Sequence, residues 1–251
     1  MRIVGAAAAA AIQSAPWQHQ LPFSRASRAF LVARSRFAED ALATAVDRGV
    51  RQYVVLGAGL DTFAYRNPLS ARGLRVFEVD YPATQEWKRR TLAEAAVDIP
   101  ATLTFVPVDF ECASLADCLH AAGLDPNAPA FFSWLGVTWY LTAEAISQVL
   151  AFVVSTPSGG GIAFDYGVPR DSVGLIGRLA YDAVAARVAM AGEPFRTAFD
   201  PVSLRAELER IGFRAISDLG AGELNARYFA GRTDGFAVVG AIGRVASAEI
   251  P

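Results

Sequence analysis

Cysteine, histidine and long hydrophobic runs are scarce in this chain of 251 residues, and each shortage argues against a class of protein. The only cysteines are Cys112 and Cys118, which are too few for a disulfide framework and have no companions that would complete a metal site. No stretch of 18 consecutive apolar residues occurs, so no membrane-spanning helix is predicted. The formal charge of −2, without a basic stripe, gives no electrostatic basis for binding nucleic acid. We therefore expect a cytoplasmic protein without a metal site, whose partner is a small molecule.

What the chain does contain is a regular alternation of short β-branched or aromatic runs with longer helical patterns. Strands are predicted at 52–57, 74–80, 103–109, 130–136, 161–166, 213–219 and 235–243. Helices are predicted at 24–49, 82–97, 114–123, 142–155 and 201–212. Several strands are apolar almost throughout, as expected when helices cover both faces of a parallel sheet. The predicted fold class is therefore α/β, with a Rossmann-like, doubly wound sheet of seven strands.

The chain shows no internal repeat and no long linker, so we expect a single domain over residues 1–251. Its alanine-rich start faintly imitates a signal peptide, but an alanine-rich helix or a frayed end is the preferred interpretation. Four parts are expected: a helical N-terminal lid segment (1–50), a cofactor-binding core (51–166), a helical insertion before the sixth strand (167–200) and the C-terminal strands (201–251).

A glycine turn, Gly57, Ala58 and Gly59, follows the first predicted strand. Glycine tolerates positive φ and lets a ligand approach the main chain. The fingerprint that grips a pyrophosphate requires a third glycine where this chain has Thr62. Asp61 or Thr62 is better interpreted as the N-cap of the next helix, and an aspartate there would repel a pyrophosphate. The turn therefore disfavours a dinucleotide.

Two acidic residues end the next two predicted strands. Asp80 closes the second strand, 23 residues after Gly57, at the spacing of acids that accept hydrogen bonds from ribose hydroxyls. Asp109 closes the third strand, where its carboxylate can bind an exocyclic amine while Phe110 covers a base. Parallel strands bring their carboxyl ends to one edge of the sheet. The three features together predict a nucleoside ligand without a pyrophosphate, which points to S-adenosylmethionine.

Several motifs resemble, in this order, those of the leucine carboxyl methyltransferase-like family of class I S-adenosylmethionine-dependent methyltransferases. They are "VARSRFAEDAL", "VVLGAGLDTFAYR", "VFEVDYPATQEWKR", "VPVDF", "FFSWLGVTWYL" and "IAFDY". The resemblance is strong from Arg25 to Tyr166 and looser over "RYFAGRTDGF" near the C-terminus. It implies the seven-stranded class I methyltransferase sheet, and it is closest to bacterial branches with polyketide O-methyltransferases.

The resemblance also implies roles for individual residues. Arg34 would hold the methionyl carboxylate of the cofactor, a task suited to a planar guanidinium. Asp80 would hold the ribose, and Tyr81 lies beside it. Gly57 would lie under the methionyl group, and Asp109 and Phe110 would lie at the adenine. The other predicted cofactor-binding positions are Ala58, Gly59 and Leu135.

Two positions depart from the family pattern. Close relatives of the eukaryotic enzyme carry a glutamate before the glycine of the fourth strand end, where this chain has Leu135. Relatives also carry a longer segment before the "ARSRF" helix, in the region that forms their lid. Both departures bear on how the cofactor and substrate are enclosed.

No residue stands out as a general base. His19 lies in the expected lid and is a candidate for a catalytic role, whereas His120 lies on a helix away from the ligand edge. Tyr140 and Tyr166 follow the fourth and fifth strands and are further catalytic candidates, at positions that could line the acceptor pocket. Because a carboxylate attacks a methyl group without a base, the shortage of bases mildly favours a carboxylate acceptor.

We thus expect an O-methyltransferase that acts on a carboxylate or hydroxyl of a small, polyketide-like metabolite of secondary metabolism. One alternative is a nicotinamide-dependent oxidoreductase, since Asp80 would suit its ribose too, although Thr62 argues against it. The other alternative is a degenerate member of the fold that binds the cofactor as a scaffold or catalyses another reaction, such as a cyclisation.

Overall fold

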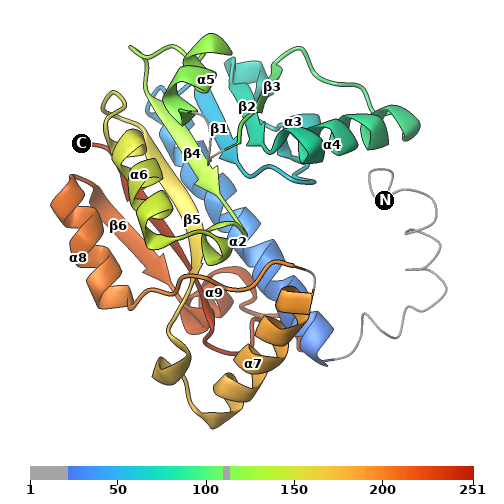
Figure 1. The fold of residues 1–251 in the computed structure, drawn as a ribbon, viewed down its shortest axis with the longest axis vertical. Coiled ribbons are helices and arrows are strands. Elements are labelled where there is room, and N and C mark those ends of the chain that lie inside the picture. Colours follow the sequence, from blue (N-terminus) through green and yellow to red (C-terminus); the bar gives the residue numbers. More distant parts are fainter. Residues whose placement is uncertain (1–21, 110–113, 191) are drawn as a thin grey trace.

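The computed structural model describes residues 22–109, 114–190 and 192–251, arranged as in Figure 1. His19, Phe110 and residues 1–21 of the expected lid segment lie outside these residues. The strands are β1 (Gln52–Leu56), β2 (Arg75–Asp80), β3 (Leu103–Pro107), β4 (Ala130–Trp134), β5 (Gly161–Gly167), β6 (Arg214–Leu219) and β7 (Gly243–Glu249). The α-helices are α2 (Pro22–Asp47), α3 (Phe63–Arg66), α4 (Pro82–Glu94), α5 (Leu115–Ala121), α6 (Ala143–Val154), α7 (Leu175–Met190), α8 (Pro201–Ile211) and α9 (Ala221–Tyr228).

Short 3₁₀ helices join some of these elements. They are η3 (Ser70–Arg72), η4 (Thr138–Tyr140) and η5 (Arg170–Ser172). Side-chain caps form at the N-termini of three α-helices, where Ser114, Thr142 and Asp200 each accept a hydrogen bond from the backbone amide three residues on. Thr62 flanks α3 without such a bond, and the Asp61 carboxylate instead accepts from the Phe63 amide at 2.7 Å.

All seven strands form one sheet in the order β3-β2-β1-β4-β5-β7-β6. Strands β1 to β5 run parallel, and β7 pairs antiparallel with both β5 and β6. In the centre, Val54 of β1 lies between Phe77 of β2 and Phe132 of β4. This mixed α/β sheet confirms the predicted fold class. The carboxyl ends of β1 to β5 meet at one edge, called here the carboxyl edge.

Helices cover both faces of the sheet, as the apolar strands predict. Helices α5, α6 and α8 pack on one face, and α2, α3 and α9 pack on the other. The strand β5 is buried along its whole length, because it lies between these two layers.

The predicted seventh strand, 235–243, is wrong. That segment has no regular structure, and β7 begins at Gly243. The side chain of Asn225 binds both backbone groups of Val238, donating to its carbonyl at 2.9 Å and accepting from its amide at 2.8 Å. Because these bonds replace a strand partner, the apolar run around Val238 needs no place in the sheet.

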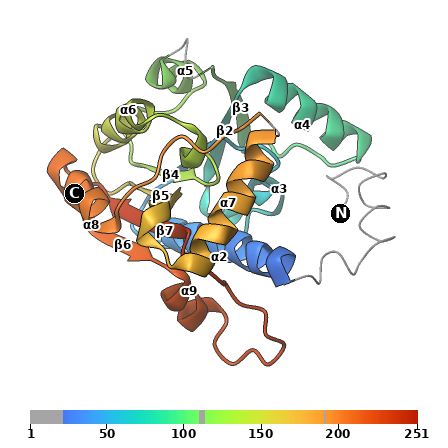
Figure 2. The same cartoon turned by 60° about the horizontal axis from the view of Figure 1, so that its bottom comes forward.

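The insertion between β5 and β6 lies where it was predicted. It holds η5 and α7, and it continues into α8. Figures 1 and 2 place α7 beside the first turns of α2, beyond the ends of β4 and β5. The insertion and the start of α2 therefore lie next to the carboxyl edge.

Candidate functional site

The glycine turn lies at the carboxyl end of β1, in the middle of the sheet. Gly57 and Gly59 have φ values of +64° and +45°, a conformation that favours glycine. The Ala58 amide donates to the Val79 carbonyl at 3.0 Å, and the Gly59 amide donates to the carboxylate of Asp80. These bonds hold the turn against the end of β2.

Asp80 ends β2 beside this turn. Its Oδ1 accepts from the Tyr81 amide at 2.7 Å, and its Oδ2 accepts from the Gly59 amide. Each carboxylate oxygen can accept two hydrogen bonds, so Asp80 retains capacity for hydroxyl donors. Tyr81 is 52% exposed and precedes the first turn of α4. The Val108 amide donates to the Asp80 carbonyl at 2.9 Å, which brings the half-buried Asp109 to the same end of the sheet.

Arg34 reaches the carboxyl edge from α2. Its Nη1 donates to Oδ2 of Asp165 at 2.8 Å, and its side chain is 19% exposed whereas that of Asp165 is fully buried. Its Nε is buried and has no hydrogen-bond partner within the described part of the chain. A buried donor without a partner is costly, and a ligand carboxylate would satisfy it. Arg34 can therefore bind a ligand anion while Asp165 holds it.

Gly136, just after β4, makes room for this guanidinium. A Cβ added at Gly136 would lie 2.8 Å from Nη2 of Arg34, and the φ of the glycine is +76°. A Cβ added at Gly57 would lie 2.4 Å from Val137 Cγ2, so the turn after β1 and the turn after β4 touch. Leu135 is partly buried and packs into the hydrophobic cluster under α2.

Asp165, in β5, is the residue that organises this part of the site, and the sequence analysis gave it no role. Its Oδ1 accepts from the Gly136 amide at 2.5 Å, and its Oδ2 accepts from Trp139 Nε1 at 3.2 Å as well as from Arg34. Its backbone carbonyl accepts from Thr138 Oγ1 at 2.6 Å. The one signal in the sequence was an acidic residue inside an otherwise apolar strand, where a buried carboxylate needs partners.

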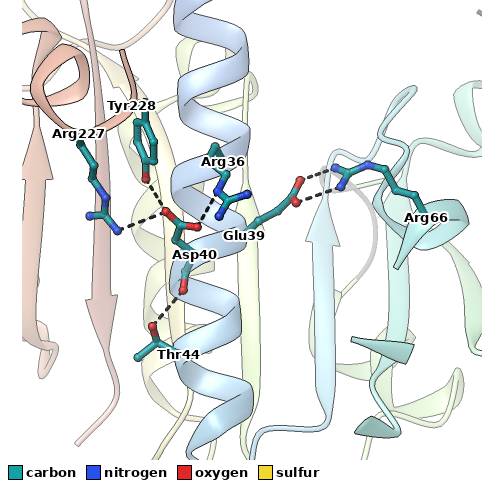
Figure 3. Close-up of polar contacts among 7 residues, drawn as sticks. All are labelled: Arg36, Glu39, Asp40, Thr44, Arg66, Arg227 and Tyr228. Carbon is teal, nitrogen blue, oxygen red and sulfur yellow. Dashed lines mark hydrogen bonds and ion pairs between the residues drawn. The ribbon is translucent and has the colours of Figure 1, made fainter. Parts of the chain in front are cut away.

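Two consecutive acids hold α2, and with it Arg34, in place on both sides (Figure 3). Glu39 pairs with the guanidinium of Arg66 on α3, which follows the glycine turn. Asp40 points the other way and accepts from Tyr228 Oη at 2.9 Å and from Arg227 Nη2 at 3.4 Å, both on α9. Burial, reinforced by the hydrogen bond to Asp40, raises the pKa of Tyr228, so this phenol stays a donor. The helix that carries Arg34 is thereby tied to α3, which follows the glycine turn, and to α9 near the C-terminus.

The two tyrosines expected at the acceptor side lie in different surroundings. Tyr140 is half-buried in η4, and burial followed by the charge of Glu193 raises its pKa. Its ring packs against Phe195 of the insertion, with 6.0 Å between centroids. Tyr166 is fully buried in the core and donates to Asp218 Oδ2 at 2.6 Å, a placement that does not support a role in an acceptor pocket.

Further side chains complete the picture. His120 is exposed on α5. Within the residues that the structure describes, no group of three or more His, Cys, Asp or Glu side chains could hold a metal ion. Among the same residues, no helix is long and apolar enough to cross a membrane.

The model of the leucine carboxyl methyltransferase family matches residues 3–154. YktD of Bacillus subtilis, provisionally named an S-adenosyl-L-methionine-dependent methyltransferase, is 37% identical over 207 residues, which cover 81% of this chain and 67% of YktD. A provisionally named methyltransferase of the same kind from Mycobacterium avium is 36% identical over 130 residues, 52% of this chain and 42% of that protein. The chain thus spans less than half of this mycobacterial relative.

Solved structures share the fold at low sequence identity. A provisionally named methyltransferase from Thermobifida fusca superposes with a TM-score of 0.62 at 16% identity, over 90% of this chain and 82% of that one. A DUF574 family protein from Streptomyces avermitilis superposes with a TM-score of 0.59 at 20% identity, over 91% and 88% of the two chains.

Proposed function

Since the chain belongs to the leucine carboxyl methyltransferase family, whose members use S-adenosylmethionine, we propose that it methylates an oxygen atom of a small metabolite. The acceptor atom would belong to a carboxylate or a hydroxyl group, and the metabolite class would include polyketide-like molecules of secondary metabolism. The observation that carries the proposal is Arg34, held by Asp165 at the carboxyl edge with a buried Nε that lacks a partner within the described chain.

The residues at the carboxyl edge suit S-adenosylmethionine. The unpartnered Nε of Arg34 supports binding of the methionyl carboxylate, and the glycine turn keeps the neighbouring main chain free of side-chain bulk. The two spare acceptor sites on the Asp80 carboxylate support binding of the ribose hydroxyls. Tyr81 and Asp109 lie next along this edge, on the side expected for the adenine.

When bound, S-adenosylmethionine supplies a methyl group on a positively charged sulfur. The task of this chain is to hold the acceptor oxygen in line with that methyl group and to keep water away. Arg34 would hold the methionyl end of the cofactor, and Asp80 would hold its ribose. Asp165 would keep the Arg34 guanidinium oriented throughout.

The acceptor side is expected where the insertion packs on η4. Phe195 of the insertion contacts Trp139, Tyr140 and Tyr181, with ring centroids 5.0, 6.0 and 5.6 Å apart. Since its pKa is raised, Tyr140 stays protonated at neutral pH and serves as a hydrogen-bond donor rather than a base. A site that has a hydrogen-bond donor but no general base suits a carboxylate acceptor better than an alcohol acceptor.

Transfer of radiolabelled methyl from S-adenosylmethionine to panels of carboxylic acids, phenols and alcohols tests this proposal. The products separate the two acceptor classes, because alkali releases labelled methanol from methyl esters but not from methyl ethers. We expect alkali-labile product. Tight cofactor binding without transfer to any panel would favour the alternative, a family member that binds the cofactor without methylating. We also expect an enzyme of the cytoplasm that does not act on nucleic acid, on the grounds of its two cysteines and its net charge of −2.

A further inference from the structure

The chain contains a single lysine, Lys88, among 23 basic residues, and that lysine is buried in the fold. Arginine fills every other basic position, at the surface and at the candidate site alike. Lys88 lies on the inner side of α4 and is only 1% exposed. An ammonium group differs from a guanidinium in being compact, with three donors that can point in separate directions. Its use at this one place indicates a site that needs a small cation.

The Lys88 ammonium joins three parts of the fold. Its Nζ donates to Oε2 of Glu78, on β2, at 2.6 Å. It also donates to the backbone carbonyl of Asp61 at 2.9 Å. The ring of Tyr65, on α3, lies with its centroid 5.4 Å from Nζ, a distance typical of a cation–π contact.

The bond from Lys88 to the Asp61 carbonyl fixes the chain just after the glycine turn, which is called here the far end of the turn. The near end is fixed by the bond from the Gly59 amide to Asp80. Between them, the Asp61 amide donates to the Ala58 carbonyl at 2.7 Å. Without Lys88, the Asp61 carbonyl would lose its side-chain donor, and the turn would be held to β2 at one end only.

The polar atoms around Lys88 do not indicate that its ion pair serves mainly to stabilise the fold. Oε1 of Glu78 and Oη of Tyr65 are both buried and have no hydrogen-bond partner among the described residues. Removing two charges from water offsets most of the attraction between them, so a buried ion pair is weak evidence for stabilisation. A pair that leaves two polar atoms unsatisfied is better explained by what it positions.

We propose that Lys88 is a positioning residue that, braced by Glu78, sets the conformation of the glycine turn for cofactor binding. The inference rests on the proposed cofactor site at the carboxyl edge. Lys88 itself does not reach the ligand; it acts through the Asp61 carbonyl and the turn that precedes it.

The test is a double variant that removes both charges, Glu78→Leu with Lys88→Met, so that neither charge is left buried alone. We expect it to fold, since apolar replacement of a buried pair is often neutral for stability. Its Kd for S-adenosylhomocysteine should rise about tenfold, the effect of one lost positioning hydrogen bond. Hydrogen exchange at the Gly59 and Asp61 amides, measured without cofactor, should accelerate about tenfold for the same reason.

The matched control is the partly buried pair of Asp218 and Arg244, between β6 and β7, whose Oδ1 and Nε are 2.9 Å apart. Asp218→Leu with Arg244→Met should change neither the Kd nor the exchange of the Gly59 amide. If the first double variant does not fold, Glu78→Gln with Lys88→Gln replaces it, because glutamine is too short by one atom to reach Asp61.

A folded variant that lacks the charges of Glu78 and Lys88, yet keeps wild-type Kd and wild-type exchange at Gly59, overturns the proposal. Failure of the wild-type protein to bind S-adenosylhomocysteine would instead contradict the cofactor site. The exchange rates would still decide the role of Lys88, because they are measured on the protein alone.

Discussion

Replacing Arg34 by methionine separates binding of a ligand anion from support of the fold. Methionine keeps the apolar stem of the side chain but removes the donors. The variant loses the 2.8 Å bond to Asp165 and leaves a fully buried carboxylate with only the Gly136 amide and Trp139 Nε1 as partners. Breaking a buried pair in this way destabilises a protein by about 3–5 kcal/mol, and the exposure of Arg34 places this variant at the lower end.

The same variant loses the charge-assisted bonds that Arg34 would make to the methionyl carboxylate. Such bonds contribute about 1.5–3 kcal/mol, so the Kd for S-adenosylhomocysteine should rise roughly 10- to 150-fold. The double variant Arg34→Met with Asp165→Asn removes the unpaired charge. It should regain most of the lost stability and none of the lost affinity.

The assay is calorimetric titration with S-adenosylhomocysteine and, in parallel, with adenosine, which lacks the carboxylate. Thermal unfolding reports the stability of each variant. We expect the loss of affinity for S-adenosylhomocysteine alone. Equal losses for both ligands would refute the reasoning and make Arg34 a structural residue of α2.

Three further outcomes are expected. Asp80→Ala should weaken binding of S-adenosylhomocysteine by about 1–3 kcal/mol in the same titration, and an unchanged Kd would remove Asp80 from the site. Gly136→Ala places a Cβ 2.8 Å from Arg34 Nη2 at a φ of +76°. This variant should lower the free energy of unfolding by about 1–3 kcal/mol and also weaken binding of the cofactor. Wild-type stability and wild-type affinity in this variant would show that the guanidinium does not need this glycine. Burial raises the pKa of Glu78 from 4.5 to about 7. Between these pH values the folded chain keeps a proton that the unfolded chain releases. The proton therefore stabilises the folded chain at low pH, and this stabilisation is lost as the pH rises from 4.5 to 7. The difference in free energy of unfolding between the wild type and the variant that lacks Glu78 and Lys88 should fall by up to about 3 kcal/mol from pH 4.5 to 7 and then level off. Urea titrations of both proteins at several pH values measure this difference. A difference that rises with pH contradicts the prediction.

The sequence predicted the strands and helices wherever local pattern and tertiary packing agree. The first six strands lie close to their predicted positions, because their apolar runs are buried between two layers of helices. The seventh strand was misplaced, since the more apolar run around Val238 is bound by Asn225 and a less apolar segment enters the sheet. Side-chain capture of a backbone segment leaves no periodic signal in a sequence.

The candidate site was predictable only where its residues mark strand ends. Gly57 and Gly59 follow one buried strand and Asp80 ends the next, so their spacing alone marks them as candidates. Asp165 could not, because its partner Arg34 lies 131 residues earlier in the chain. The placement of Tyr166 could not be predicted either. Because β5 is buried on both faces, its sequence shows no alternation of apolar and polar residues that would tell which side chains reach the carboxyl edge.

The measurement that tests the central claim most directly is calorimetric titration of the purified wild-type chain with S-adenosylhomocysteine, which cannot turn over. We expect one site per chain with a Kd on the order of micromolar, given a charged contact at Arg34 and another at Asp80. Absence of binding at millimolar ligand would contradict the proposal that the carboxyl edge of this sheet holds the cofactor.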